Sequence, residues 1–260
     1  MFPSIDLFGI VSIHTFGLCM SIAMLLFFTG LYYHTSRSGM NRNIFKELLS
    51  YTIAIFFFGR LFYIITEWVN LKFMFQDVST WEFIKNFFLM QNYNLSLMGG
   101  GIGFFLVFWW KSHIYGLHRV HIHKYLDIIV LSFMTASIIG YVGSLLGGQI
   151  YGTPTSLPIG IIYTHPDVPY TQPVFPLPVF YAIIMTLASV ILFQLHHKYK
   201  VDGFAGYVGM IIFGGMLFLG EFMNGSEDIF KSIIFINLNQ IGAIVIAYFG
   251  IKGFMELIKI

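Results

Sequence analysis

Charged residues are scarce in this chain. Only 10% of its 260 residues are Asp, Glu, Lys or Arg, whereas 57% are hydrophobic, and a typical soluble domain has about 25% charged residues. This composition excludes a soluble globular domain and predicts an all-α polytopic membrane protein. The net charge of +2 is spread over short connections, so it gives no reason to expect nucleic acid as a partner.

Cysteine is almost absent as well. The one cysteine, Cys19, lies inside an apolar run, which excludes a disulfide framework or a thiolate metal site within one chain. Residues 1–7 lack a basic n-region, so the first apolar run is predicted to remain as a membrane span. Four histidines between residues 113 and 123 have only Asp127 as a nearby carboxylate. This favours a solvated loop over a metal site, and we expect neither a metal nor a cofactor.

Seven apolar segments approach the roughly 20 residues needed to cross a bilayer. They are residues 11–33, 46–66, 95–112, 125–148, 174–195, 204–223 and 232–254. Ten Lys and Arg residues fall in alternate connections, and three fall in the others. By the positive-inside rule, we predict seven transmembrane helices with the N-terminus out and the C-terminus in. The whole chain, 1–260, is expected to be one integral membrane domain, with an outer-interface arm at 67–94 and a long periplasmic loop at 149–173.

Two glycine-rich segments interrupt these runs. Five glycines fall within residues 140–152, and Gly140, Gly143 and Gly147 recur at helical spacing. Each glycine costs about 1 kcal/mol in a helix interior, so another interaction must offset this cost. Glycines leave a flat face on the helix, and either a second helix or a lipid head group can approach that face closely. Gly99, Gly100 and Gly101 open the third run, where backbone N–H groups favour an anion unless they too serve helix packing.

Ionisable side chains inside the apolar runs are few. They are His14, Arg60, Asp127 and Glu221. Asp127 is expected to be solvated near the inner interface. Arg60 and Glu221 both lie toward the outer ends of their runs, and a guanidinium there needs a carboxylate, carbonyl groups or a lipid phosphate. An Arg60–Glu221 ion pair and head-group binding therefore stay as alternatives. Because both glycine-rich segments fall on the same predicted side, the sequence indicates an outer-leaflet lipid pocket.

These segments, in this order, resemble the bacterial prolipoprotein diacylglyceryl transferase family. Gly59-Arg60-Leu61 resembles its second-span Gly-Arg motif, and residues 96–103 resemble Ser-x-His-Gly-Gly-x-x-Gly. Residues 140–152 resemble its signature Gly-Arg-x-Gly-Asn-x-x-Asn-Gly-Glu-x-x-Gly, and Glu221 and Gln240 also match. The resemblance implies a multi-pass protein of the bacterial inner membrane that moves the diacylglyceryl group of phosphatidylglycerol onto a lipobox cysteine.

The departures from the family pattern fall at its polar positions. The motif histidine is Met98, the signature arginine is Tyr141, the histidine before Pro176 is Phe175, and the sixth-span arginine is Leu217. Met98 and Phe175 cannot accept a proton, and Leu217 and Tyr141 cannot match the charge of a phosphate. Ser144, Gly147 and Gln149 replace two asparagines and the glutamate of the signature.

We therefore predict a family relative that keeps a phosphatidylglycerol-type head-group site and lacks the usual catalytic set. The predicted site consists of Arg60, Gly99, Gly100, Gly101, Gly140, Tyr141, Gly143, Ser144, Gln149 and Gln240. The alternative is an active lipid transferase with rearranged residues, in which His14 or Glu221 is the candidate base and Arg60 holds the phosphate. The expected partners are a phospholipid and either a lipoprotein precursor or other membrane-protein subunits.

Overall fold

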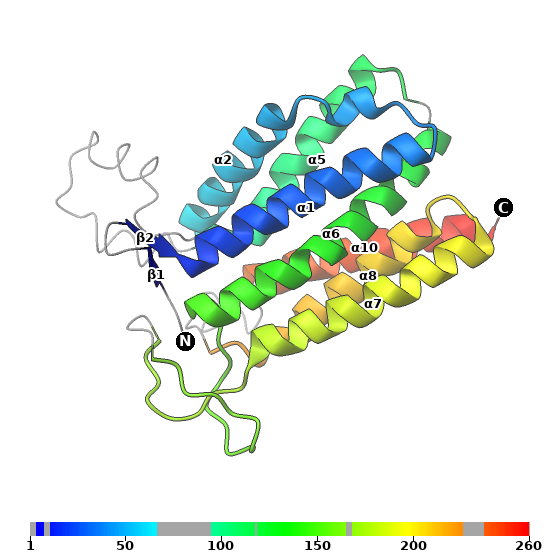
Figure 1. The fold of residues 1–260 in the computed structure, drawn as a ribbon. Helices are drawn as coiled ribbons and strands as arrows, with labels where there is room; N and C mark the ends of the chain where they lie inside the picture. The colour runs from blue at the N-terminus through cyan, green and yellow to red at the C-terminus, as the bar shows by residue number, and fades with distance from the viewer. Residues whose placement is uncertain are drawn as a thin grey trace. The chain divides into compact units, whose positions relative to one another are not determined.

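The computed structural model describes residues 4–7, 11–66, 95–117, 119–164, 168–225 and 237–259. Within these residues the chain forms seven α-helices, one on each predicted apolar segment (Figure 1). They are α1 (Thr15–Arg37), α2 (Leu48–Thr66), α5 (Leu97–Ile114), α6 (Arg119–Gly147), α7 (Leu177–Tyr199), α8 (Phe204–Gly220) and α10 (Leu238–Ile258). Two strands, β1 (Ser4–Leu7) and β2 (Val11–His14), and the 3-10 helix η1 (Arg42–Phe45) complete the described elements. The predicted arm at 67–94 lies outside the described residues.

Helices α1 and α7 begin three or four residues later than the apolar runs suggest, for reasons that the structure shows. The first run was predicted to begin at residue 11, but residues 11–14 form β2, which pairs antiparallel with β1 so that Ser4 lies opposite His14. Val11 and Ile13 alternate with polar residues, the two-residue period of a strand. Helix α7 begins at Leu177, after the N-cap Pro176, because Val174 and Phe175 form backbone hydrogen bonds with the preceding loop.

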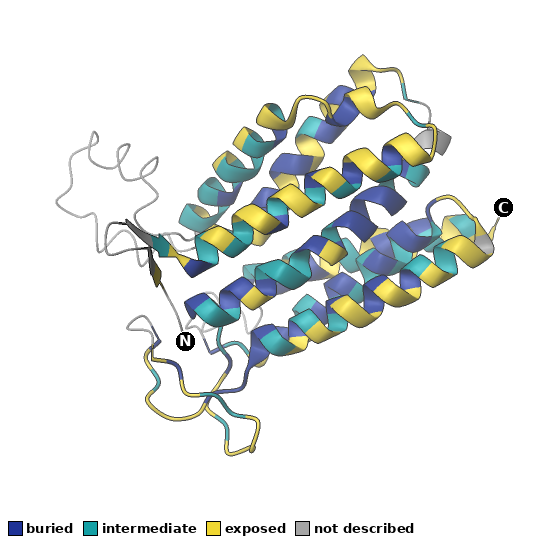
Figure 2. Ribbon diagram, in the orientation of Figure 1, coloured by how far each residue is buried: buried dark blue, intermediate teal, exposed yellow. Residues whose placement is uncertain are grey.

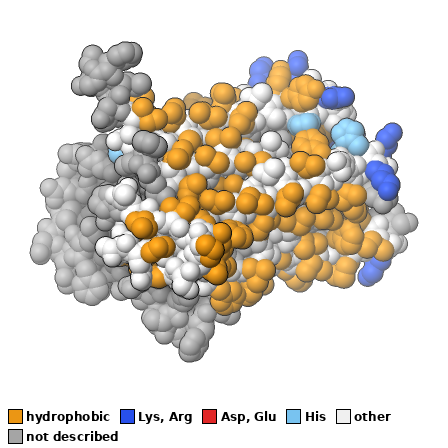
Figure 3. All heavy atoms as spheres, turned by 60° about the horizontal axis from the view of Figure 1, so that its bottom comes forward, with side chains coloured by type: hydrophobic (Ala, Val, Ile, Leu, Met, Phe, Trp, Pro, Cys, Tyr) orange, Lys and Arg blue, Asp and Glu red, His pale blue; other side chains and the backbone are white. Residues whose placement is uncertain are grey.

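Five of the helices are long and apolar enough to cross a membrane. They cover Thr15–Arg37, Leu48–Ile65, Ile122–Gly147, Leu177–Lys198 and Leu238–Ile258, and the apolar helix α8 is shorter. Hydrophobic side chains cover most of the helical surface in view (Figure 3). The prediction of an all-helical, membrane-spanning fold is therefore confirmed at this level, while seven spans and their orientation stay predictions.

The described chain divides into two compact units. Unit 1 comprises residues 1–40, 118–227 and 239–260, and unit 2 comprises residues 41–117 and 228–238. Each unit is described below by itself, and a single domain over 1–260 stays a prediction.

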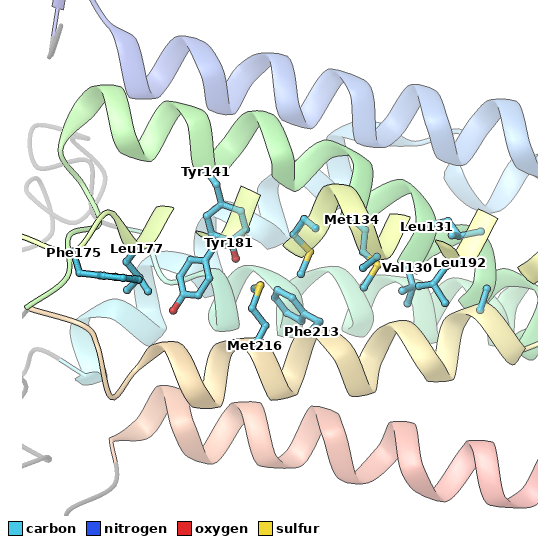
Figure 4. Packing of buried hydrophobic residues seen from close by; sticks show 13 residues of the cluster. Val130, Leu131, Met134, Tyr141, Phe175, Leu177, Tyr181, Leu192, Phe213 and Met216 are labelled. Atoms are coloured by element: carbon cyan, nitrogen blue, oxygen red, sulfur yellow. The ribbon is translucent and has the colours of Figure 1, made fainter. Parts of the chain in front are cut away.

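Helix α6 is the centre of unit 1. It packs against α1, α7 and α8, and it is the most buried of the five long apolar helices (Figure 2). The core between α6, α7 and α8 is apolar and contains Met134, Met185 and Leu192, all with no exposed surface (Figure 4). Helix α10 packs closely against α8 at Gly214. An added methyl group there would lie 2.6 Å from the backbone oxygen of Ala243 in α10.

Unit 2 is built on the pair α2 and α5, with η1 against α5. The side chain of Lys111 is 3% exposed, and its Nζ lies 2.6 Å from Glu47 Oε2. The same ammonium group lies 5.4 Å from the centre of the Tyr51 ring. The buried cation therefore has both a carboxylate and an aromatic face as partners.

The loop between α6 and α7 is ordered by backbone pairing. Isolated antiparallel bridges join Val174 to Pro154 and to Ile161. The Tyr163 hydroxyl donates a hydrogen bond to the Ile150 carbonyl oxygen (3.2 Å), and burial raises the pKa of Tyr163 to about 12. This loop corresponds to the predicted long loop at 149–173, of which residues 165–167 lie outside the described part.

Candidate functional site

A polar cluster lies at the end of α8 in unit 1, centred on Glu221. Its carboxylate accepts hydrogen bonds from the amide Nδ2 atoms of Asn224 (to Oε2, 3.1 Å) and Asn239 (to Oε1, 3.2 Å). Glu221 is only 8% exposed, and a carboxylate removed from water requires such donors. The end of α8, the turn after it and the start of α10 thus bring three polar side chains together.

Two tyrosines lie between this cluster and the apolar core. The ring centroids of Tyr141 from α6 and Tyr181 from α7 are 5.0 Å apart (Figure 4). The Tyr181 hydroxyl lies against Gly220, where any side chain would collide with it, and Gly220 directly precedes Glu221. The Tyr141 hydroxyl is buried and makes no hydrogen bond within the described part of the chain. Among the described residues, nothing serves as a partner for this polar atom.

The turn after α8 is tied to the loop that precedes α7. Thr153 N donates to Met223 O (2.9 Å), and Gly225 N donates to Tyr151 O (3.0 Å). An added methyl group at Gly225 in this turn would collide with the Gly152 backbone oxygen of the loop, so only glycine allows the two segments to approach this closely. The loop therefore fixes the position of the turn that carries Glu221 and Asn224.

An apolar groove adjoins the tyrosines on the outside of unit 1. It has a volume of about 330 Å³ and lies between α6 and α7, with Tyr141, Leu145, Val179 and Ile183 among its lining residues. Tyr141 thus belongs both to the groove and to the aromatic pair next to the Glu221 turn. A polar cluster at the end of α8 and an apolar groove between α6 and α7 are the two parts that an amphiphilic ligand requires.

The glycine face predicted on α6 packs against α1. An added methyl group at Gly143 would collide with the Cys19 side chain, one at Gly147 would lie 2.8 Å from Phe16 Cβ, and one at Gly140 would lie 3.5 Å from Met20 Sδ. Of the two explanations left open by the sequence, close helix packing accounts for this face in unit 1. A lipid contact of Gly140 and Gly143 stays a prediction.

The other predicted residues of unit 1 are spread over its elements. Ser144 donates its hydroxyl to the Gly140 carbonyl oxygen (3.1 Å) on the same helix. Gln149 follows the end of α6, where its backbone N–H bonds to the Ser144 carbonyl oxygen. Gln240 is fully buried in the first turn of α10. His14 is exposed at the N-cap of α1. None of the contacts described for these residues reaches the Glu221 cluster.

The predicted residues of unit 2 lie on α2 and α5. The Arg60 guanidinium lies 5.8 Å from the ring centre of Tyr63, one turn along α2. Glu221 belongs to unit 1, so the Arg60–Glu221 pair stays a prediction. In the first turn of α5, the Gly99 N–H is capped by the Ser96 hydroxyl (3.4 Å). A side chain at Gly99 would collide with the Phe58 backbone oxygen, whereas Gly101 faces open space.

Three residues near the Glu221 cluster are absent from the site predicted from the sequence. They are Asn224, Asn239 and Tyr181. A tyrosine in the aliphatic α7 segment was the available signal, because a buried hydroxyl needs a partner. The contact between the two asparagines and Glu221 depends on how the end of α8 meets the start of α10, which the spacing along the chain does not give.

A model of the prolipoprotein diacylglyceryl transferase family matches residues 4–255. The chain belongs to this family. Three similar proteins are phosphatidylglycerol–prolipoprotein diacylglyceryl transferases. The Clostridium tetani protein is 27% identical over 222 residues, covering 85% of this chain and 84% of its own. The Clostridium perfringens transferase 2 is 26% identical, covering 90% of this chain and 88% of its own. The Prochlorococcus marinus protein is 23% identical, covering 78% and 72%.

Membership of the prolipoprotein diacylglyceryl transferase family, together with the five long apolar helices, makes this chain a multi-pass membrane protein. Three of the positions that the resemblance matches to charged or basic residues of the family lie in or against the hydrophobic core. Tyr141 and Phe175, each 5% exposed, are members of the core cluster, and Leu217 packs against it. At these positions unit 1 therefore has an apolar interior in place of cationic and basic groups.

Proposed function

We propose that this chain is a phospholipid-binding member of the prolipoprotein diacylglyceryl transferase family that lacks the standard catalytic set. The observation that supports this best is the packing of Tyr141, Phe175 and Leu217 in or against one apolar cluster. Losing one charge-stabilising donor typically costs about 3–4 kcal/mol of transition-state stabilisation. The loss of several, with apolar side chains in their places, leaves a binding site rather than the usual reaction.

The proposed ligand is a phospholipid of the phosphatidylglycerol type. Glu221 is the hydrogen-bond acceptor for the hydroxyl groups of the glycerol head. Asn224 and Asn239 hold the Glu221 carboxylate in place. The groove between α6 and α7 takes an acyl chain, with Tyr141 at the junction. Arg60 and Gly99–Gly101 belong to unit 2, and a phosphate contact there stays a prediction from the sequence. The protein is placed in the bacterial inner membrane with seven spans, where it presents the lipid to a lipoprotein precursor or another membrane subunit.

Native mass spectrometry of the purified full chain tests this proposal. After delipidation and incubation with phosphatidylglycerol, the wild type should retain one lipid per chain. Glu221→Gln should reduce retention several-fold with the chain still folded, because an amide oxygen is a weaker acceptor than a carboxylate. The exposed Glu256→Gln serves as a matched control. Equal retention in all three proteins would contradict the proposed head-group site.

An active transferase is the second candidate, favoured by the names of the three relatives. In that reaction a deprotonated lipobox thiol forms a C–S bond with the diacylglyceryl carbon. The bond from that carbon to the phosphate oxygen breaks, glycerol phosphate leaves, and the thiol proton goes to a base. Here His14 or Glu221 is the candidate base, and Arg60 stabilises the leaving phosphate.

Complementation separates the two candidates. The chain is expressed in a strain depleted of its own diacylglyceryl transferase, and a lipobox peptide is incubated with purified protein and phosphatidylglycerol. We expect no growth rescue and no lipidated peptide. Rescue that is lost in Glu221→Gln or His14→Ala would replace the binding proposal with the transferase.

A further inference from the structure

A second pocket lies at the opposite end of the unit 1 helices, where α1 and α7 end and α6 and α8 begin (Figure 1). It has a volume of about 250 Å³ and is lined by Ser38, Lys124, Ile128, His196, Lys200 and Asp202. These residues come from the ends of three helices and from the α7–α8 turn. The positive-inside pattern predicts that this end faces the cytoplasm.

Two lysines, Lys124 and Lys200, line this pocket together with one carboxylate, that of Asp202. Within the part of the chain that the structure describes, neither Lys124 nor Lys200 makes a side-chain hydrogen bond or a salt bridge. The Ser38 hydroxyl and the His196 ring add further hydrogen-bonding groups. Basic pockets between helices at the cytoplasmic side of a membrane bind anionic head groups.

The buried acid beneath the pocket already has its own partners. Asp127 is fully buried, and its carboxylate accepts hydrogen bonds from the backbone N–H groups of Gly203 (2.7 Å) and Gly206 (2.6 Å). It therefore caps the N-terminus of α8, where the helix dipole favours a negative charge. His196 Nδ1 lies 3.7 Å from the same carboxylate. The structure thus commits Asp127 to the N-terminus of α8.

Lys200 adopts a backbone conformation that glycine would adopt more easily. Its φ is 49°, and among the described residues it is the one non-glycine with positive φ. It is the C-cap of α7, a position where glycine is usual because any Cβ is disfavoured there. A lysine at a position where glycine is favoured points to a role for its side chain.

We propose that this pocket binds a phosphate group through Lys124, Lys200 and Ser38. An anionic phospholipid head group and a soluble phosphate ester both present this chemistry. The site differs from the Glu221 cluster in residues, charge and membrane side. The carboxylate of Asp202, which also lines the pocket, repels the bound anion. Substituting a lysine should therefore weaken anion binding, and neutralising Asp202 should strengthen it.

Hydrogen exchange of the full chain in detergent tests the proposal, read on peptides covering residues 196–206. The probes are dioctanoyl-phosphatidylglycerol, dioctanoyl-phosphatidylcholine and glycerol 3-phosphate, each titrated to an apparent Kd. Removing one lysine charge is worth about 1 kcal/mol near such a surface, or about five-fold in Kd. Lys124→Gln and Lys200→Gly should each weaken binding by that factor. Asp202→Asn should tighten it, and Lys252→Gln, outside the pocket, should change nothing.

Lys200→Gly should also keep or raise the melting temperature, so weaker binding there cannot be ascribed to unfolding. Stronger protection by phosphatidylglycerol than by glycerol 3-phosphate assigns the site to a lipid, and equal protection assigns it to a soluble ester. The proposal is overturned if no anionic probe protects residues 196–206, if phosphatidylcholine protects them equally, or if all four variants bind with the wild-type Kd.

Discussion

At the residue scale, the Tyr141 hydroxyl is buried without a hydrogen bond in the described part of the chain. A polar atom in this situation carries a desolvation cost of about 1–3 kcal/mol. Tyr141→Phe should therefore leave stability unchanged or raise it by up to about 1 kcal/mol, measured by thermal unfolding in detergent. If the hydroxyl contacts the proposed lipid, the same variant should bind that lipid less well.

Tyr163 is the matched control for this experiment. Its hydroxyl donates to the Ile150 carbonyl oxygen, so Tyr163→Phe removes a hydrogen bond and should cost about 1 kcal/mol. Equal destabilisation by both substitutions would mean that Tyr141 has a partner in the folded protein. The comparison thus distinguishes a hydroxyl that the fold uses from one that it leaves for a ligand.

The Lys111–Glu47 pair gives a second prediction for single residues. Lys111 is buried, but the Glu47 side chain is 65% exposed, so water already screens part of the interaction. Glu47→Gln should destabilise unit 2 by about 1–2 kcal/mol, because the buried ammonium keeps only a neutral acceptor. Adding Lys111→Met should recover most of this loss, since replacing both partners removes the buried charge. A double variant less stable than Glu47→Gln alone would contradict this account.

At the element scale, α5 carries its own matched pair of glycines. A side chain at Gly103 would collide with the backbone oxygen of Ala54 on α2, whereas Gly101 has nothing within 4 Å. Gly101→Ala should stabilise the protein by up to about 1 kcal/mol through helix propensity alone. Gly103→Ala should lower the melting temperature because α2 and α5 must separate. Equal effects of the two substitutions would show that this helix contact is not as tight as described.

The elements were predictable from hydropathy because every helix in the described residues coincides with an apolar run of suitable length. Their starts were less predictable, since residues 11–14 lie in the first apolar run but pair with β1. Glycine spacing correctly indicated close approach, and the partner of Gly143 proved to be Cys19. Which surface meets a glycine depends on how the helices are arranged, and residue spacing within one helix does not encode that arrangement.

The polar cluster around Glu221 shows even more clearly that the sequence does not reveal which residues meet in the fold. Glu221 was predicted as a functional residue because a carboxylate at membrane depth is costly. Its contacts with Asn224 and Asn239 bring the end of α8 to the start of α10. The sequence marks residues that need partners, and tertiary structure decides which partners they receive.

At the scale of the whole molecule, the orientation of the chain in the membrane decides which leaflet each proposed site faces. The Glu221 cluster lies at the loop end of the unit 1 helices and the lysine pocket at the other end, so their membrane sides follow together from the topology. Cys19→Ser gives a cysteine-free background, because Cys19 is the one cysteine of the chain. Ser156→Cys in the loop and Ser36→Cys near the end of α1 then introduce thiols at exposed positions.

A membrane-impermeant maleimide should label the Ser156→Cys protein in right-side-out vesicles and the Ser36→Cys protein only in inverted ones. The physical reason is that basic residues near Ser36 are retained on the cytoplasmic side during insertion. The reverse pattern would move the Glu221 cluster to the cytoplasmic leaflet and the lysine pocket to the outer one. A lipoprotein precursor arriving at the outer face would then have no access to the lipid held beside Glu221, which would exclude lipid presentation as the function.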